Sequence, residues 1–353
     1  MFDTFLGNAR IAGDLRRMLA QNRLPQTLLF SGPAGVGKAT LARLLAAALN
    51  CADHAADPCG QCPACRRILA DDLSLPPYQK LFEERAKASP DKRRDSPLVV
   101  SSFPEFLTFP PDGPLAQISI EQVRKLKEYA QFGPSQGRRR LFLIDQGDRM
   151  DSAAANSLLK ILEEPPPYLT LVLTATNAFD LLPTIRSRAV PFYFAPLSRA
   201  EMEQFLAARP EITPRDRARL LGWAKGSPGR AVAIDIGAWE RRRQAMLALL
   251  AGGFAELLPH TEAIGRSKSE KLELQLDALY GLLRDLVCLQ HGSGPLVNED
   301  LRDQLAPLAA RVDFPWLERT LVEVDRLDGL VRRNVQKQIA LEALAVALRN
   351  SPQ

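Results

Sequence analysis

The residues most capable of chemistry are three glycines and a lysine that have the spacing of a phosphate-binding loop: Gly32, Gly35, Gly37 and Lys38. An apolar run precedes them and a helix-forming run, residues 39–50, follows. Glycine permits backbone conformations closed to other residues, so successive N–H groups can turn inward on a phosphate. The lysine would reach the β- and γ-phosphates, and the positive end of the following helix points at them. This pattern predicts a nucleotide phosphate cradle with ATP or ADP as candidate ligands. A glycine-rich turn without a ligand is the alternative.

The loop departs from the pattern G-x-x-x-x-G-K-[ST] at its last position, which holds Ala39. The hydroxyl comes one residue later, at Thr40. Successive residues of a helix point about 100° apart, so Thr40 is displaced from the place where a hydroxyl ligates Mg²⁺. The sequence therefore predicts the cradle, with Thr40 as its nearest hydroxyl, but it does not support a regular Mg²⁺ ligand.

A carboxylate follows the apolar run at residues 141–144, which has the form of a strand buried in a parallel sheet. Ligands of such sheets bind at the carboxyl edge, so Asp145 could hold Mg²⁺ opposite Lys38, directly or through water. The next residue is Gln146, where an ATP hydrolase of this type usually carries a glutamate. Because an amide cannot take a proton from the attacking water, we expect little or no ATP hydrolysis by this chain.

Four cysteines form a C-x7-C-x2-C-x2-C cluster: Cys51, Cys59, Cys62 and Cys65. Turns of this spacing present thiolates to one tetrahedral ion, and four sulfur ligands leave no open position. We therefore predict a structural Zn²⁺ site in residues 51–65. A redox pair or incidental thiols are the alternatives, and His54 could replace one cysteine. Cys288 lies in an apolar helical run and is expected in a core.

The composition is that of a globular protein, with 46% hydrophobic residues among 353. The formal net charge is only +5, so a nucleic-acid role must depend on local basic groups. The two such groups, residues 138–140 and 241–243, are short and lack interleaved aromatics, and solvated turns explain them. No uncharged apolar run reaches the length of a membrane span, and residues 1–5 do not form a signal peptide. We expect a soluble, cytoplasmic protein without a membrane partner.

Alternating strands and helices indicate an α/β fold with a parallel sheet covered by helices. The expected strands follow the apolar runs at residues 28–30, 141–144, 170–176 and 190–194, and the expected helices are residues 1–27, 39–50, 119–132 and 152–164. Residues 66–117 mix proline and charge without a period and predict a long, partly disordered surface excursion. From residue 197 the pattern is helical, with breaks near Gly252–Gly253, residues 292–295 and Pro315. We predict an α/β phosphate-loop module over 1–196, a small helical lid over 197–240 and an all-α domain over 241–353.

Several motifs in this order resemble the clamp-loader subunits of the AAA+ superfamily. Besides the glycine loop and the cysteines they are Leu143-Ile144-Asp145, the run LLKILEEPP at 158–166, Ser187-Arg188-Ala189, GSPGR at 226–230 and residues 334–348. The resemblance implies a five-subunit ring that opens a sliding clamp and places it on primer-template DNA, with ATP bound between neighbouring subunits. It also implies that residues 241–353 form an oligomerising collar.

The resemblance assigns roles to three further residues. Arg188 matches the arginine of the family's S-R-C motif, which reaches the ATP site of the next subunit, although Ala189 stands in place of the cysteine. Thr176 matches the sensor-1 position and Arg230 the sensor-2 position. The alternatives are a plain surface arginine and purely structural roles for the other two.

Departures from the family pattern indicate which type of subunit this is. Motor subunits are expected to keep a hydroxyl after the lysine and a glutamate after the aspartate, where this chain has Ala39 and Gln146. The chain also ends near the collar, without the extra domains of the long motor form. It therefore looks like the non-motor, delta-prime type of subunit in a bacterial DNA polymerase III, a nucleotidyltransferase holoenzyme at the nucleoid. Its expected partners are delta and gamma/tau-like subunits. A motor subunit of the same loader and a zinc-dependent nucleic-acid-binding module are the alternatives.

Overall fold

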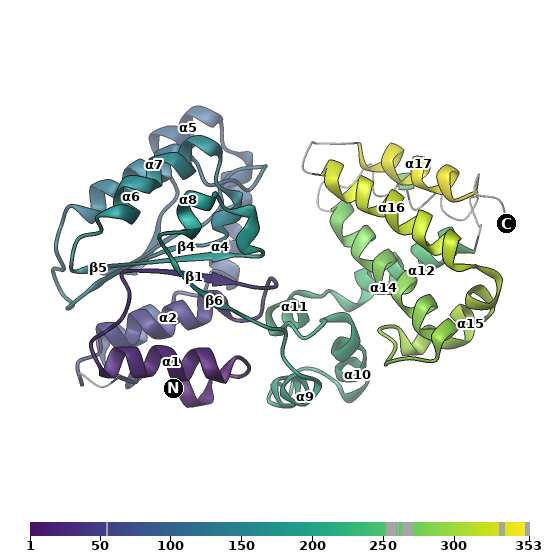
Figure 1. Cartoon of the computed structure of the whole chain (residues 1–353), viewed down its shortest axis with the longest axis horizontal. Helices are drawn as coiled ribbons and strands as arrows, with labels where there is room; N and C mark the ends of the chain where they lie inside the picture. The colour runs from purple at the N-terminus through teal and green to yellow at the C-terminus, as the bar shows by residue number, and fades with distance from the viewer. Residues whose placement is uncertain (54–55, 252–258, 260, 263–270, 332–335, 350–353) are drawn as a thin grey trace. The chain divides into compact units, whose positions relative to one another are not determined.

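A computed structural model describes residues 1–53, 56–251, 259, 261–262, 271–331 and 336–349 (Figure 1). The predicted break at Gly252–Gly253, as well as His54 and Asn334, lie outside these residues. The chain forms two compact units. Unit 1 comprises Met1–Glu201 and Ser227–Gly229, and unit 2 comprises Met202–Gly226 and Arg230–Gln353. The finer division into module, lid and collar stays a prediction.

Unit 1 is built on a six-stranded sheet with the order β2-β3-β4-β5-β1-β6. The strands are β1 (Thr27–Ser31), β2 (Val100–Phe103), β3 (Phe106–Phe109), β4 (Arg140–Ile144), β5 (Leu169–Ala175) and β6 (Val190–Tyr193). Strand β2 pairs antiparallel with β3, and all other pairs are parallel. Parallel strands covered on both faces need apolar residues at every position, which explains why β1, β4 and β5 are buried throughout. The predicted parallel-sheet α/β fold is confirmed.

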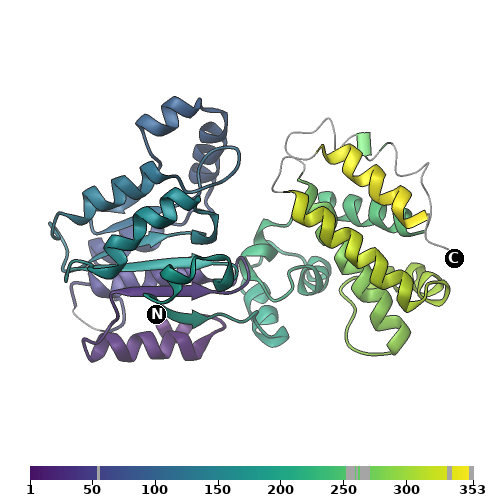
Figure 2. The same cartoon turned by 45° about the horizontal axis from the view of Figure 1, so that its top comes forward.

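Helices cover both faces of this sheet, as Figures 1 and 2 show. They are α1 (Ala9–Ala20) and α2 (Lys38–Leu49) on one face and α6 (Ile120–Ala130) and α7 (Ser152–Glu163) on the other. Because side chains alternate along a strand, Leu28 and Phe30 of β1 enter the first core and Leu29 enters the second. The predicted N-cap Ser119 begins α6 with a reciprocal capping box to Gln122.

The N-terminal segment is not one helix, contrary to the sequence prediction for residues 1–27. A 3-10 turn, Phe2–Thr4, is separated from α1 by Gly7 and Asn8, which have φ of 73° and 52°. These left-handed conformations interrupt the helix while its apolar spacing continues, so spacing alone did not reveal the break.

The predicted excursion at residues 66–117 is ordered, and the prediction of partial disorder was wrong. It begins within α3 (Pro63–Ala70) and contains α4 (Pro76–Lys87), α5 (Pro90–Asp95) and the two sheet strands β2 and β3. Each of the three helices has proline in its first turn, where the missing N–H costs nothing. The prolines therefore start helices in this segment instead of marking a loop.

From Arg199 onward, the described regular elements are helical. They are α9 (Arg199–Ala207), α10 (Pro214–Trp223), α11 (Pro228–Ala233), α12 (Ile236–Leu250), α14 (Leu272–His291), a 3-10 turn (Glu299–Leu301), α15 (Arg302–Arg311), α16 (Phe314–Val331) and α17 (Lys337–Arg349). The predicted break near Pro315 is confirmed at residues 312–313, between α15 and α16, and Pro315 lies in the first turn of α16. The predicted helical C-terminal region is confirmed.

Candidate functional site

The glycine loop lies at the carboxyl edge of the sheet, between β1 and α2. The Gly32 N–H donates to the carbonyl of Ala175 at the end of β5, with 3.1 Å between the atoms. A Cβ on Gly32 would lie 2.3 Å from the carbonyl oxygen of Phe194, so a side chain cannot fit there. Gly35 and Gly37 have φ of 77° and 101°. The loop has the left-handed turns that let N–H groups face an anion.

Lys38 begins α2 and is buried, with its ammonium turned onto the loop itself. Its Nζ donates to the carbonyls of Gly32 at 2.5 Å and Pro33 at 2.7 Å. Burial lowers the pKa of Lys38, while the charges of Asp145 and Asp148 oppose this shift. The charges of two carboxylates from the segment after β4 therefore act on Lys38. An aspartate near the lysine of the loop is what binding of a Mg²⁺-nucleotide would use.

Asp145 is held by a threonine that the sequence prediction missed. The hydroxyl of Thr174, a fully buried residue of β5, donates to Asp145 Oδ1 at 2.7 Å and accepts the N–H of Gln146 at 2.8 Å. A polar residue inside the apolar run of β5 was the available signal. Gln146 itself is exposed and has a left-handed backbone, with φ of 55°. No carboxylate stands at this position to activate a water.

Asp148 is a second acidic residue that the sequence prediction missed, three positions after Asp145. Its Oδ2 accepts the N–H of Thr176 at 3.4 Å. Its Oδ1 is buried and has no partner among the described residues. The charge of Asp148 acts on Lys38, whereas Thr176, the predicted sensor, is exposed and bonds Asp148 through its backbone N–H. The sensor role of Thr176 stays a prediction.

The recorded hydrogen bond of the Thr40 hydroxyl is to Arg43 and not to Asp145 or Asp148. The hydroxyl accepts from Arg43 Nη2 at 3.3 Å, and the same nitrogen pairs with Asp72 at 2.7 Å. The displacement by one helical position thus places the hydroxyl beside the segment that follows α3. Its predicted part in cofactor binding stays a prediction.

The motif at residues 226–230 contacts the glycine loop through its middle residues. The Ser227 hydroxyl donates to the carbonyl of Ala34 at 2.8 Å, and the Gly229 N–H donates to that of Gly35 at 2.9 Å. Arg230 belongs to unit 2, where its guanidinium pairs with Asp277 and donates from Nε to the carbonyl of Trp223 at 2.9 Å. The sensor-2 role of Arg230 stays a prediction.

Arg188 follows the short helix α8 (Pro183–Arg186) and lies at the surface of unit 1. Its Nη2 donates to Glu163 Oε1 at 2.7 Å. Its Nη1 donates to the carbonyl of Thr184 at 2.9 Å and to the Ser187 hydroxyl at 3.2 Å. One third of the arginine side chain is exposed (33%), so a group from outside can reach it.

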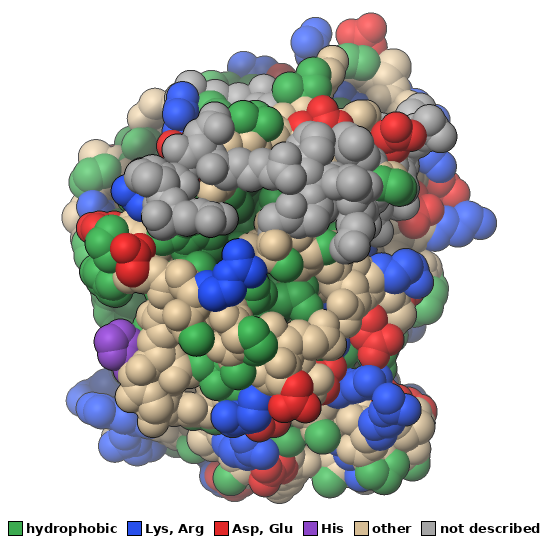
Figure 3. Space-filling view, turned by 90° about the vertical axis from the view of Figure 1, so that its right-hand side faces the viewer, with side chains coloured by type: hydrophobic (Ala, Val, Ile, Leu, Met, Phe, Trp, Pro, Cys, Tyr) green, Lys and Arg blue, Asp and Glu red, His purple; other side chains and the backbone are tan. Residues whose placement is uncertain are grey.

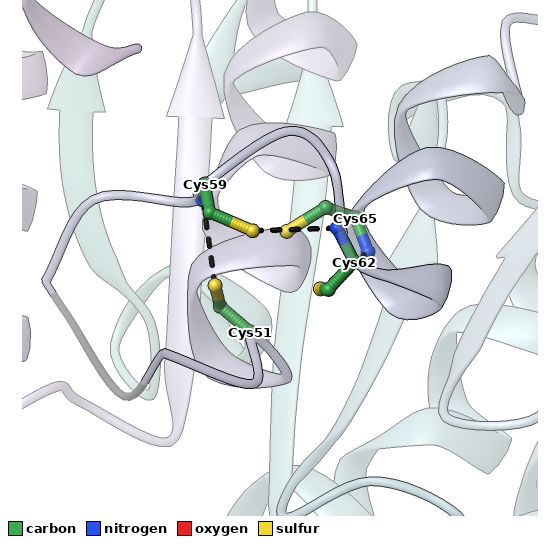
Figure 4. A group of neighbouring side chains, drawn as sticks. All are labelled: Cys51, Cys59, Cys62 and Cys65. Atoms are coloured by element: carbon green, nitrogen blue, oxygen red, sulfur yellow. Dashed lines mark hydrogen bonds between the residues drawn. The ribbon is translucent and has the colours of Figure 1, made fainter.

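The four cysteines converge at the junction of α2 and α3 (Figure 4). Cys51 follows α2, Cys62 is the N-cap of α3 and Cys65 lies in its first turn. All four sulfurs lie within 4.8 Å of one another. Tetrahedral zinc with Zn–S bonds of about 2.3 Å needs sulfurs about 3.8 Å apart, so a small contraction suffices.

Within the cluster, the surroundings of Cys62 favour a thiolate, whereas burial raises the pKa of the Cys65 thiol. Burial tends to raise the pKa of the Cys62 thiol, yet N–H groups of Ala52 and Cys65 and neighbouring thiols outweigh it and lower that pKa to about 7. The Cys59 N–H donates to Cys51 Sγ at 3.3 Å, and the Cys62 N–H to Cys59 Sγ at 3.4 Å. The donor set therefore fits a closed, structural metal site.

The two basic groups are not simply solvated turns, as the sequence had suggested. Arg140 is buried and donates to the carbonyls of Tyr129 and Phe132 at 2.6 and 2.7 Å. Arg243 is buried, pairs with Asp300 at 2.9 Å and stacks on Trp223. On the face drawn in Figure 3, basic and acidic side chains are interspersed. Arginines of both groups are thus committed to internal contacts.

No helix among the described residues is long and apolar enough to cross a membrane.

Two family models match this chain. One, described as "DNA polymerase III, delta subunit", matches residues 7–198, and the other, described as "DNA polymerase III, delta subunit, C terminal", matches residues 237–349. The chain belongs to the DNA polymerase III delta-subunit family of clamp-loader proteins. The resemblance to AAA+ clamp-loader subunits is confirmed.

Curated relatives of this delta-family chain are larger proteins. DNA polymerase III subunit gamma/tau of Mycobacterium tuberculosis is 34% identical over 207 residues, which cover 58% of this chain and 30% of the relative. Subunit tau/gamma of Haemophilus influenzae is 31% identical over 231 residues, which cover 65% of this chain and 29% of the relative. The chain thus spans about a third of the length of these relatives. A gamma subunit-related protein of Thermotoga maritima is similar in structure with a TM-score of 0.44 and 15% identity, covering 96% of this chain and 98% of its own.

Proposed function

We propose that this chain is a non-motor, delta-prime-like subunit of a DNA polymerase III clamp loader. In this role it joins delta and gamma/tau-like subunits in a five-membered ring and supports ATP-driven loading of the sliding clamp onto primed DNA. The observation that carries the proposal is the exposure of the Arg188 side chain at the surface of unit 1. An arginine presented there can stabilise charge on the phosphates of an ATP bound by a neighbouring subunit.

The chain's own phosphate loop supports a passive role. It has the glycine turns and Lys38, but Ala39 offers no hydroxyl to Mg²⁺ and Gln146 no base to water. We infer that the loop can hold the phosphates of ATP or ADP without turning ATP over. Asp145 and Asp148 lie where they could meet a cation, and Thr174 orients the first of them.

The cysteine cluster is proposed to hold a structural Zn²⁺. Four sulfur ligands leave no position for a substrate, so the ion would supply stability to the junction of α2 and α3 and no chemistry.

The test compares two variants in a loader reconstituted with its partner subunits, clamp and primed DNA. We expect Arg188→Ala to slow ATP hydrolysis about 10³-fold or more at the ATP site that receives this arginine. The total ATPase rate of the loader then falls by the fraction that this one site contributes. Lys38→Ala in this chain should leave the total rate unchanged, because its own site does not hydrolyse ATP. Abolished turnover in Lys38→Ala would instead establish the motor alternative.

The same preparation separates the nucleic-acid-binding alternative. That alternative requires salt-sensitive binding of DNA by this chain alone and its loss in Cys59→Ser. We expect weak binding that does not depend on Cys59, because Arg140 and Arg243 are buried in internal contacts.

A further inference from the structure

Glu163 and Arg188 meet at the surface of unit 1, although they are far apart in sequence. Glu163 is the last residue of α7, and Arg188 follows α8. The two helices are fixed to one another because Leu162, next to Glu163, and Ile185, three residues before Arg188, are buried in the same core. The carboxylate is therefore presented to the guanidinium by a rigid support.

The contacts of Arg188 engage only part of its guanidinium. A guanidinium has five N–H donors. Both donors of Nη1 have acceptors, at Thr184 and Ser187, and one donor of Nη2 is bound to Glu163. Within the described residues, no acceptor is recorded for the Nε–H or for a second Nη2–H. The Nε–H and one Nη2–H therefore remain for oxygens that come from outside, and arginine binds phosphate with donors of this kind.

The energetics of the Glu163–Arg188 ion pair indicate that it orients the arginine side chain and contributes little to the stability of the fold. Glu163 is exposed and Arg188 is one-third exposed, and ion pairs in such surroundings contribute little to folding. A free arginine side chain populates many rotamers, and it must lose this freedom when it binds a phosphate. A carboxylate that already holds one edge of the guanidinium removes part of that cost.

We propose that Glu163 is a positioning residue for Arg188, which it holds so that the Nε–H and one Nη2–H stay available to a nucleotide phosphate bound by another subunit. The inference rests on the proposed function of Arg188. The hydrogen bond, more than the charge of Glu163, performs this task, since a second negative charge beside a phosphate is no advantage. A glutamine at this position should therefore serve.

The test uses the complete reconstituted loader with clamp, primed DNA and ATP. The Arg188-dependent turnover is defined as the part that Arg188→Ala removes. We expect Glu163→Ala to lower the kcat of this part about tenfold with little change in KM for ATP, because the group remains but its orientation is lost. Glu163→Gln should retain most of it. Glu164→Ala is the matched control, since this neighbouring glutamate is also exposed and the recorded carboxylate partner of Arg188 is Glu163. Thermal unfolding of the isolated chain should be the same for all three variants.

The outcomes separate the two proposals. An unchanged rate in Arg188→Ala overturns the trans-acting arginine and the positioning role with it. If the loader with Arg188→Ala hydrolyses ATP slowly but the loader with Glu163→Ala has a normal or higher rate, the positioning role alone is overturned. Equal losses in Glu163→Ala and Glu164→Ala, or no rescue by Glu163→Gln, also overturn it, because either result traces the effect to charge.

Discussion

At the scale of single residues, the candidate nucleotide site depends on a hydroxyl that joins two strands. Thr174 of β5 bonds both the Asp145 carboxylate and the Gln146 N–H, which follow β4. Thr174→Val keeps the shape of the side chain but removes the buried hydroxyl that pairs the partly buried Asp145 carboxylate and the Gln146 N–H. We expect the free energy of unfolding to fall by about 1–3 kcal/mol in urea denaturation. Thr176→Val is the control, and its exposed position predicts a change near zero. Equal effects of the two substitutions would show that the bonds of Thr174 do not matter.

The sequence revealed those site residues whose types and spacing are set by local chemistry. The glycine turns, Lys38 and the cysteines are close in sequence because one loop or one helix end presents them. Asp148, Thr174 and the pairing of Glu163 with Arg188 were not predicted. Their roles depend on the adjacency of β4 to β5 and of α7 to α8, which no local pattern contains. Long-range contacts are the part of a site that single-sequence reasoning loses.

At the scale of elements, the segment between α3 and β3 shows how the same residues can be misinterpreted. Its prolines and charges predicted a loop, yet proline is also the residue best suited to the first turn of a helix. The charges are used as well, since Arg85 of α4 forms a largely buried pair with Asp112. In contrast, β1, β4 and β5 were predicted because a strand buried on both faces has a continuous apolar run.

Helix α4 is tied to the end of α3 by Tyr78, whose hydroxyl donates to the buried carboxylate of Asp71. Burial and this bond raise the pKa of Tyr78 to about 12. The unfolded chain loses the proton near pH 10, so stability present below pH 10 is lost as the pH rises toward 12. We expect Tyr78→Phe to lose about 1–3 kcal/mol at pH 8 and to depend less on pH above 10. Urea denaturation at pH 8 and at several pH values above 10 measures the free energy of unfolding of both proteins. The same dependence on pH in Tyr78→Phe and in the unsubstituted chain would refute the role of this hydrogen bond.

At the scale of the whole molecule, the cysteine cluster and the tryptophans, which are natural fluorescent probes, belong to different units. The cysteine cluster belongs to unit 1, where Cys51 and Cys65 are part of a core that α1 and α2 share. All three tryptophans of the chain, Trp223, Trp239 and Trp316, belong to unit 2. Tryptophan fluorescence therefore reports on unit 2 alone, whereas far-UV circular dichroism reports on both units.

This separation gives a direct test of the metal proposal. Removal of Zn²⁺ by a chelator leaves four thiols crowded in the core of unit 1, so we expect its unfolding, followed by circular dichroism, to shift down by about 5 °C or more. The tryptophan transition should not move. Cys59→Ser should reproduce the shift without chelator, and Cys288→Ser in α14 is the control because it lies outside the cluster. No shift in either signal would exclude a structural metal. Equal shifts of the two unfolding temperatures would show that the two units unfold in one cooperative transition, because a metal bound to unit 1 would then stabilise unit 2 as well.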